Sequence, residues 1–248
     1  MEVGFKTDKG LRRTNNEDAC FVMKQDRIFI VADGVGGSNS GEIASRTCVS
    51  EIAKYVENHS MKNLSGDDEI ESYFRDCLKD VNFKVLELSQ RYERNKGMAT
   101  TVVIAYVLGD ALYIVNVGDS RAYLLRQGML TQITEDHTYV NTLLKAGLIS
   151  PEQAAYHEKK NMITRAVGAD YTIEADYFKV AIEAGDIVLI CTDGLYGEVE
   201  EGELTALLNR NESPGRICDE LVAAANRNGG SDNITMVVLK VAEEDINE

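Results

Sequence analysis

Residues 100–125 read TTVVIAYVLGDALYIVNVGDSRAYLL, and this stretch decides the fold. Three apolar runs, at 100–107, 111–117 and 121–125, are separated by short spacers that contain Gly109-Asp110 and Gly118-Asp119. Apolar runs of this length with such spacers predict strands that are joined by hairpins. Because a hairpin joins antiparallel neighbours, the stretch favours an antiparallel sheet.

Further strands and helices are expected on both sides of this block. Before it, strands are expected at 3–6, 19–24 and 27–32, and then two helical patterns built on Ala44, Cys48, Ile52 and Tyr55 and on Phe74, Leu78, Val81, Val85 and Leu88. After it, we expect short helices at 140–146 and 151–155, strands at 173–180 and 187–191, helices at 203–208 and 216–226, and a strand at 234–241. This order lacks regular βαβ alternation. It predicts an α+β fold with two packed antiparallel sheets and helices outside.

The composition is that of one globular domain. The chain has 248 residues, of which 44% are hydrophobic and 27% charged, and its only prolines are Pro151 and Pro214. Its net charge of -15 disfavours nucleic acid and anionic membranes as partners. With no signal region or run long enough to span a bilayer, a cytoplasmic protein is expected. The five cysteines form no CxxC pair and there are three histidines, which argues against a zinc site.

Several aspartates follow the most apolar predicted strands. Residues 28–31 run into Ala32-Asp33-Gly34, residues 187–191 run into Thr192-Asp193-Gly194, and two more acidic turns contain Asp119 and Asp232. The glycine after each of the first two aspartates would let the chain turn sharply. A single Asp-Gly is ordinary turn chemistry, but several at the ends of buried strands can converge. Two carboxylates about 5 Å apart repel by roughly 3 kcal/mol at an effective dielectric of 20, so such a cluster calls for a cation. Oxygen ligands suit magnesium, manganese or calcium, and a pair of such ions suits phosphoryl chemistry.

A second charged segment lies near the start, at residues 13–18. Arg13 can bind a phosphate through two parallel hydrogen bonds, and Glu17 and Asp18 can hold water or accept a proton from it. Alone, this segment is a charged turn between strands. The chain contains neither a GxxxxGK[ST] loop nor a Cys-x5-Arg loop, so other phosphate chemistries are poor matches.

Six short motifs together resemble the metal-dependent protein phosphatases, the protein phosphatase 2C (PPM) family, in its short bacterial serine/threonine form. The motifs are Arg13 with Asn16-Glu17-Asp18, Asp33-Gly34-Val35-Gly36-Gly37, Gly97-Met98-Ala99-Thr100-Thr101, Gly118-Asp119-Ser120-Arg121-Ala122, Thr192-Asp193-Gly194-Leu195 and Ser231-Asp232-Asn233-Ile234-Thr235. Each is weak alone, but they occur in the order of the family and span nearly the whole chain. The resemblance implies a four-layer α-β-β-α sandwich.

The resemblance also implies a metal site that holds two Mn²⁺ or Mg²⁺ ions tightly and a third more weakly. Asp33 would bridge two ions, and the carbonyl of Gly34 would bind one of them. Asp193 and Asp232 would complete the other. Asp119, with Asp193, would hold the weaker third ion.

Substrate and catalytic roles follow from the same resemblance. Arg13 would bind the substrate phosphate, and Glu17 and Asp18 would orient metal-bound water, with Asp18 as the proton acceptor. The water that bridges the two ions would attack directly. Asp33 would be the carboxylate that bridges the same two ions. Animal members have histidine where this chain has Val35, so the general acid is open, with a metal-bound water or a histidine (His137 or His157) as candidates.

A mobile flap is expected at about 144–168, with a basic bias from Lys145, Lys159, Lys160 and Arg165. We expect one phosphatase domain over 1–242 and a polar tail at 243–248.

The leading hypothesis is a phosphoserine/phosphothreonine protein phosphatase that opposes a bacterial serine/threonine kinase. Its partners would be phosphoproteins and the kinase, and the chain would be a monomer without membrane insertion. A small-molecule phosphomonoesterase on the same site and a non-catalytic pseudophosphatase that binds phosphoproteins are the alternatives.

Overall fold

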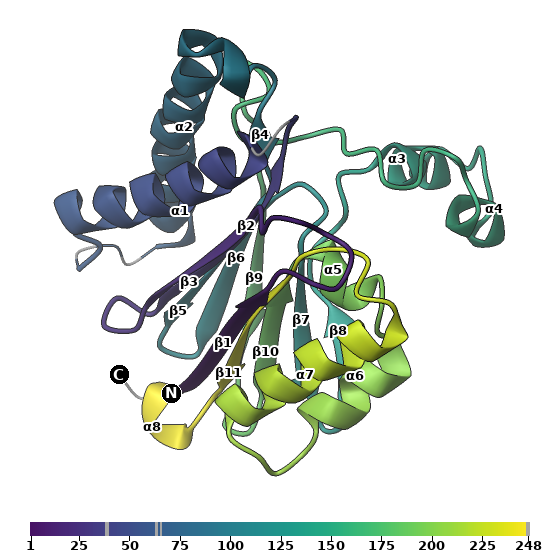
Figure 1. Ribbon diagram of the computed structural model, residues 1–248. Coiled ribbons are helices and arrows are strands. Elements are labelled where there is room, and N and C mark those ends of the chain that lie inside the picture. The colour runs from purple at the N-terminus through teal and green to yellow at the C-terminus, as the bar shows by residue number, and fades with distance from the viewer. Residues whose placement is uncertain (38–39, 63, 65, 247–248) are drawn as a thin grey trace.

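Two antiparallel sheets lie face to face in the computed structural model, which describes residues 1–37, 40–62, 64 and 66–246 (Figure 1). One sheet has the strand order β1 (Glu2–Asp8), β11 (Ile234–Lys240), β10 (Ile187–Cys191), β7 (Arg121–Arg126) and β8 (Met129–Gln132). The other has the order β2 (Asp18–Met23), β3 (Ile28–Val35), β5 (Val102–Leu108), β6 (Ala111–Val117) and β9 (Asp176–Ala181), and β4 (Ala99–Thr100) pairs with the end of β3. The pairing within both sheets is antiparallel, as the hairpin spacing predicts.

Alternate residues of the central strands divide between two buried layers. On β3, Phe29 and Val31 face the other sheet, where they join Val188 and Ile190 of β10 in one apolar cluster. The intervening residue Ile30 joins the cluster beneath the helices. A strand buried on both faces reads as a continuous apolar run, which is why residues 28–32 show no alternation in the sequence.

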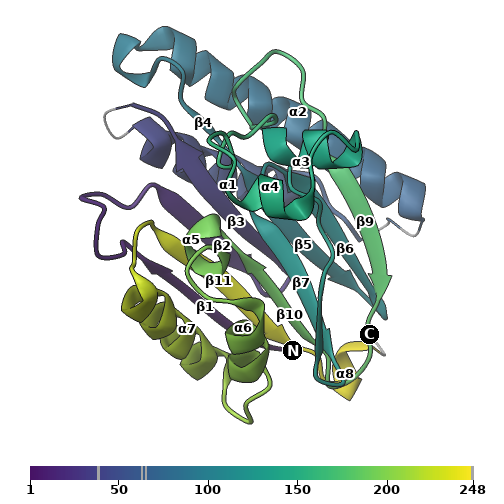
Figure 2. The same ribbon diagram turned by 90° about the vertical axis from the view of Figure 1, so that its right-hand side faces the viewer.

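Helices cover both outer faces, so the predicted four-layer sandwich is confirmed (Figure 2). One outer layer consists of α1 (Ser40–Asn58) and α2 (Asp67–Arg91), and the other of α5 (Asp193–Tyr196), α6 (Glu201–Leu208) and α7 (Pro214–Asn228). Helix α7 begins with a cap in which the Ser213 side chain accepts a hydrogen bond from the Arg216 amide, with Pro214 in the first turn. Both features favour a helix start at this point.

A helical segment projects from the sandwich where the flap is expected (Figure 1). It contains α3 (Tyr139–Lys145) and α4 (Pro151–Ala155), and each begins at a hydroxyl cap, Thr138 and Ser150. A bridge between Thr138 and Ile163 closes its base. The projecting part therefore begins and ends earlier than the predicted range of 144–168, because Val167 pairs with Thr100 and is fully buried in the sandwich. Motion of this flap stays a prediction.

Short elements account for most other differences from the sequence prediction. Strands β4 and β8, the 3₁₀ turn η1 (Glu93–Asn95) and helix α5 were not expected. In the expected polar tail, α8 (Glu243–Ile246) lies beside the N-terminus, where Asp245 pairs with the amino group of Met1 and Ile246 packs against the inner core. Residues 247–248 of that tail lie outside the described residues. Within the described part of the chain, the helices are too short or too polar to traverse a bilayer.

Candidate metal and phosphate site

The predicted aspartates meet at one cavity of about 250 Å³. Each comes from a different segment: the end of β3, the turn between β6 and β7, the start of α5 and the loop before β11. The predicted residues that line it are Arg13, Glu17, Asp33, Gly34, Asp119, Asp193 and Asp232. Asp18 is buried next to this lining. The structure thus brings together the residues that the sequence singled out.

Asp33 lies on a strand that continues past it. Asp33 pairs directly with Asp18 across the β2–β3 ladder, and β3 extends to Val35, so the predicted sharp turn after Asp33 is absent from this described segment. Gly34 serves close packing instead, because a Cβ there would lie 2.1 Å from the carbonyl oxygen of Gly41 at the start of α1. The glycine lets the helix approach the strand.

Asp193 is the first residue of α5 rather than part of a turn. Its partner Gly194 is also a close-approach position, where a Cβ would lie 1.9 Å from the carbonyl oxygen of Asn233. The Oδ1 atom of Asp193 is buried and has no hydrogen-bond partner among the described residues. A buried carboxylate oxygen left in this state is costly unless something binds it.

Asp232 carries the ion pair of the site. Its Oδ2 accepts a 2.7 Å hydrogen bond from Nη2 of Arg13, and its Oδ1 accepts one of 2.8 Å from the Asn233 amide. The Asn233 side chain in turn accepts from the amide of Glu17 at 2.8 Å. Asn233 therefore ties the loop before β11 to the segment that presents Arg13 and Glu17.

Two buried threonines form hydrogen bonds with the aspartates Asp18 and Asp33. The Thr192 hydroxyl donates to Oδ2 of Asp18 at 2.8 Å and accepts from the Thr235 amide at 3.0 Å. The Thr101 hydroxyl accepts from the Asp33 amide at 3.0 Å and shares a 2.7 Å bond with the Ser120 hydroxyl, which links the Asp33 strand to the Asp119 turn. Both threonines occur in the family motifs, but no pattern in the sequence indicates these contacts.

Burial and mutual repulsion raise the pKa values of the aspartates in the site. Desolvation raises the pKa of Asp18 and of Asp119 to about 7, and the charge of Asp193 adds to both effects. Burial also raises the pKa of Asp33 well above its usual range, and Asp18 and Asp193 repel its charge. Burial and the charge of Asp232 raise the pKa of Asp193, and the charge of Arg13 opposes the shift. The carboxylates destabilise one another as charged groups, which is the condition that a cation relieves.

The donor set fits hard divalent cations. Its donors are carboxylate and carbonyl oxygens, and one of them is the partnerless Asp193 Oδ1. Among the described residues, however, the side chains of His, Cys, Asp and Glu form no group of three close enough to hold an ion as they stand. The Arg13 pair with Asp232 gives a physical reason, because the guanidinium already occupies the side of one carboxylate.

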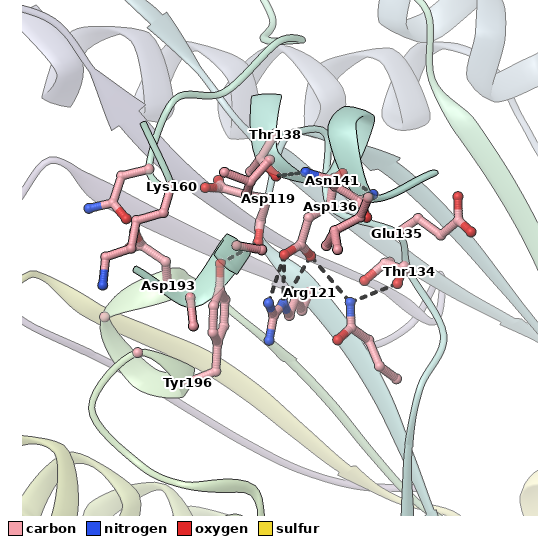
Figure 3. A pocket seen from close by; sticks show the side chains of 18 of the residues that line it. Asp119, Arg121, Thr134, Glu135, Asp136, Thr138, Asn141, Lys160, Asp193 and Tyr196 are labelled. Carbon is pink, nitrogen blue, oxygen red and sulfur yellow. Dashed lines mark hydrogen bonds and ion pairs between the residues drawn. The ribbon is translucent and has the colours of Figure 1, made fainter. Parts of the chain in front are cut away.

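A larger cavity of about 820 Å³ continues from the first and runs under the projecting segment. Asp119, Asn161, Asp193 and Asp232 line both cavities. Figure 3 shows Arg121 in this second cavity between Asp136 and Tyr196, with Lys160 at its edge. The smaller cavity thus opens into a groove bounded by the projecting segment on one side and by α5 on the other.

The two candidate histidines are held away from the cavities. His137 is buried, its Nδ1 accepts from the Gly118 amide at 3.1 Å, and its Nε2 lies 3.1 Å from Asp176. His157 lies beside Tyr139, with its Nδ1 bonded to the Lys159 amide. The cavity wall at the position of the animal histidine is the half-exposed Val35. A structural role therefore explains the surroundings of His137 better than proton transfer does.

Comparison with known proteins identifies the family. Residues 11–235 match the family profile described as "Protein phosphatase 2C". The chain is 37% identical to "Serine/threonine phosphatase stp" of Listeria monocytogenes serovar 1/2a over 97% of this chain and 96% of the relative. It is 34% identical to "Protein phosphatase PhpP" of Streptococcus pneumoniae serotype 2 over 99% of both chains.

Solved structures agree with the sequence matches. The serine/threonine phosphatase of S. agalactiae superimposes with a TM-score of 0.90 at 33% identity, over 97% of this chain and 99% of that chain. The catalytic domain of the serine threonine protein phosphatase PstP, solved in complex with 2 manganese ions, gives a TM-score of 0.84 at 32% identity, over 97% and 98%. The architecture, the order of the motifs and these matches agree along almost the full length, and the chain belongs to the protein phosphatase 2C family.

Proposed function

We propose that this chain hydrolyses phosphoserine and phosphothreonine in proteins with the help of divalent metal ions. Its relatives in Listeria and Streptococcus are named serine/threonine phosphatase and protein phosphatase. The observation that carries the proposal is the meeting of four aspartates from separate segments with Arg13 in one cavity of about 250 Å³. Phosphate monoesters are among the slowest compounds to hydrolyse unaided, so a site for them needs strong electrostatic stabilisation.

The metal ligands would be the oxygen donors of this cavity. Asp33, the Gly34 carbonyl, Asp193 and Asp232 would hold two ions, and Asp119 with Asp193 would hold a third more weakly. Manganese is the first choice, because the similar PstP domain was solved with 2 manganese ions. When bound, such ions neutralise the phosphate and the carboxylates and make water more acidic.

The remaining residues would bind the substrate and move protons. Arg13 lines the cavity. Its guanidinium would exchange the hydrogen bond with Asp232 for hydrogen bonds with the phosphate oxygens. Asp18 is fixed by Thr192 opposite Asp33, where it would accept the proton of the attacking water. Glu17 would orient that water. Histidine is absent from the described lining of both cavities, so of the two candidates for the general acid, a histidine and a metal-bound water, we favour the water.

The groove favours a polypeptide substrate over a free phosphomonoester. Its volume of about 820 Å³ lies beyond the residues that would hold the phosphate, and a small ester would leave it unused. The complete set of Asp33, Asp119, Asp193 and Asp232 argues against a pseudophosphatase. A serine/threonine kinase acting on the same proteins is the partner we propose, with the chain acting as a monomer.

Turnover of a phosphothreonine peptide tests the proposal. The peptide should be hydrolysed with added Mn²⁺, and EDTA should stop the reaction. Its kcat/KM should exceed that of p-nitrophenyl phosphate. A higher kcat/KM for the free ester would favour the small-molecule alternative, and no hydrolysis of either compound would favour the non-catalytic one.

A further inference from the structure

The hydroxyl of Tyr196 connects the two halves of the expected third-ion site. Tyr196 is the last residue of α5, and Asp193 is the first. Its hydroxyl donates a 2.8 Å hydrogen bond to the backbone carbonyl of Asp119. Asp119 and Asp193 both line the cavity, so one side chain joins the backbone that carries the first carboxylate to the helix that carries the second.

Arg121 holds the Tyr196 ring in place. The Arg121 Cζ atom lies 3.7 Å from the centroid of that ring, which is a close cation–π contact. Three hydrogen bonds to Asp136, of 2.9 and 3.2 Å from Nε and 2.7 Å from Nη2, fix the guanidinium (Figure 3). Arg121 follows Asp119 by two residues. Tyr196 therefore contacts this short segment twice, through its ring at Arg121 and through its hydroxyl at Asp119.

Both carboxylates lie on short elements. Helix α5 has only 4 residues, too few for a helix to be stable alone. Asp119 lies in the turn between β6 and β7. A cation shared by two carboxylates binds tightly only when both are held at the right distance, and residues that orient ligands typically change metal affinity by about 10–100-fold.

We propose that Tyr196 is a positioning residue that sets the distance between Asp119 and Asp193 and thereby the affinity of the weaker ion that they share. This inference rests on the third-ion role proposed above for Asp119. Tyr196 touches neither phosphate nor metal in this account. It acts through the backbone of Asp119 and the placement of α5.

The Tyr196→Phe variant tests the inference, because it removes the hydroxyl and keeps the ring that stacks on Arg121. The matched control is Tyr123→Phe, since the Tyr123 hydroxyl accepts a 3.0 Å hydrogen bond from Nη1 of the same arginine but does not contact Asp119. Calorimetric titration of the metal-stripped proteins with Mn²⁺ measures each class of site without turnover. We expect the weakest Kd to rise about tenfold in Tyr196→Phe, with the tighter sites and the melting temperature of the apoprotein close to wild type.

Activity gives a second readout. In Tyr196→Phe the Mn²⁺ concentration for half-maximal turnover should rise about tenfold, while KM for the phosphothreonine peptide at saturating Mn²⁺ stays unchanged. Tyr123→Phe should leave both values at wild type. Equal weakening of the third site in both variants, or unchanged Mn²⁺ binding in Tyr196→Phe, would overturn the positioning role.

The outcome separates this inference from the function on which it rests. If wild type binds no weaker third ion, the third-ion role of Asp119 fails and the inference fails with it. If wild type binds that ion and Tyr196→Phe binds it equally well, only the positioning role fails. Hydrolysis of the phosphothreonine peptide by wild type is unaffected by either result.

Discussion

Asp18 and Asp33 lie directly opposite each other on neighbouring antiparallel strands, and Asp33 lines the metal-site cavity. Like charges directly opposite each other on a sheet are normally destabilising. Here the Thr192 hydroxyl binds the first carboxylate, and the Asp33 amide is bound by Thr101. The fold therefore fixes two mutually repelling groups at close range, an arrangement that suits a cation-binding catalytic site.

Thr192→Val tests the support of Asp18. The variant keeps the shape of the side chain but removes the donor to Asp18 and leaves the Thr235 amide without its acceptor. We expect the free energy of unfolding to fall by about 1–3 kcal/mol. We also expect kcat to fall by about tenfold, because Asp18 loses its fixed orientation as proton acceptor. Thermal melts and steady-state kinetics measure the two effects.

The matched control for Thr192 is Thr205→Val on α6, where the hydroxyl only donates to a carbonyl within its own helix. That variant should keep wild-type kcat. A Thr192→Val protein with wild-type kcat would remove Asp18 from the chemistry or Thr192 from its support.

Arg13→Ala tests the phosphate contact. Loss of a charge-assisted hydrogen bond should raise KM for a phosphothreonine peptide by about tenfold or more, with a smaller change in kcat. Removal of the guanidinium also frees Asp232 for metal binding, so the Mn²⁺ affinity should not decrease. Arg12→Ala is the control, because Arg12 is exposed and outside the cavity lining. An unchanged KM in Arg13→Ala would exclude the arginine from the phosphate site.

Gly34→Ala tests whether close packing fixes the strand that carries Asp33. The new Cβ would lie 2.1 Å from the Gly41 carbonyl, so strand and helix must separate. We expect a loss of about 1–3 kcal/mol in the free energy of unfolding and a weaker affinity for Mn²⁺. Gly202→Ala on α6 is the control, since a Cβ there meets open space and alanine favours the helix. A stable Gly34→Ala protein with wild-type Mn²⁺ affinity would refute this reading.

The pH dependence of metal binding follows from the raised pKa values. Burial raises the pKa of Asp18 and Asp119 to about 7, against about 3.9 in an unfolded chain. In the apoprotein, the contribution of these two groups to stability is greatest below pH 4 and is lost as the pH rises through about 7. Cations reverse this loss, and protons compete with them.

Mn²⁺ should therefore raise the melting temperature more at pH 8 than at pH 6 and bind more weakly at pH 6. Thermal melts with and without Mn²⁺ at the two pH values, with KCl to match the ionic strength, measure this. An equal or larger increase at pH 6 would contradict the assignment of these carboxylates to the metal site.

The large elements of the fold could be predicted from the sequence because local patterns determine them. The Gly-Asp spacers at 109–110 and 118–119 do separate β5, β6 and β7, and the apolar runs of β3 and β10 are strands. The small elements could not be predicted. Strand β8 has one buried residue in 4, and α5 has only 4 residues. Neither is long or apolar enough to show a strand or helix pattern of hydrophobic residues in the sequence.

The gathering of the site residues could be predicted, but the contacts that hold them could not. Asp33 and Asp193 follow strands that a reader can recognise. The bonds from Thr192 to Asp18 and from Tyr196 to Asp119 join residues 174 and 77 positions apart, and only the folded chain brings these together. The prediction of a sharp turn at Gly34 was wrong, because the reason for that glycine is a neighbouring helix rather than its own backbone.

Mn²⁺ binding by Asp33→Asn tests the central claim most directly. Calorimetric titration of the metal-stripped wild type should show at least two tightly bound ions per chain. The variant should lose at least one of them, and phosphothreonine turnover should fall by about 100-fold or more. Asp219→Asn, a surface change at the partner of Lys6, should behave as wild type. An Asp33→Asn protein that binds the same number of Mn²⁺ ions at wild-type affinity would contradict the account.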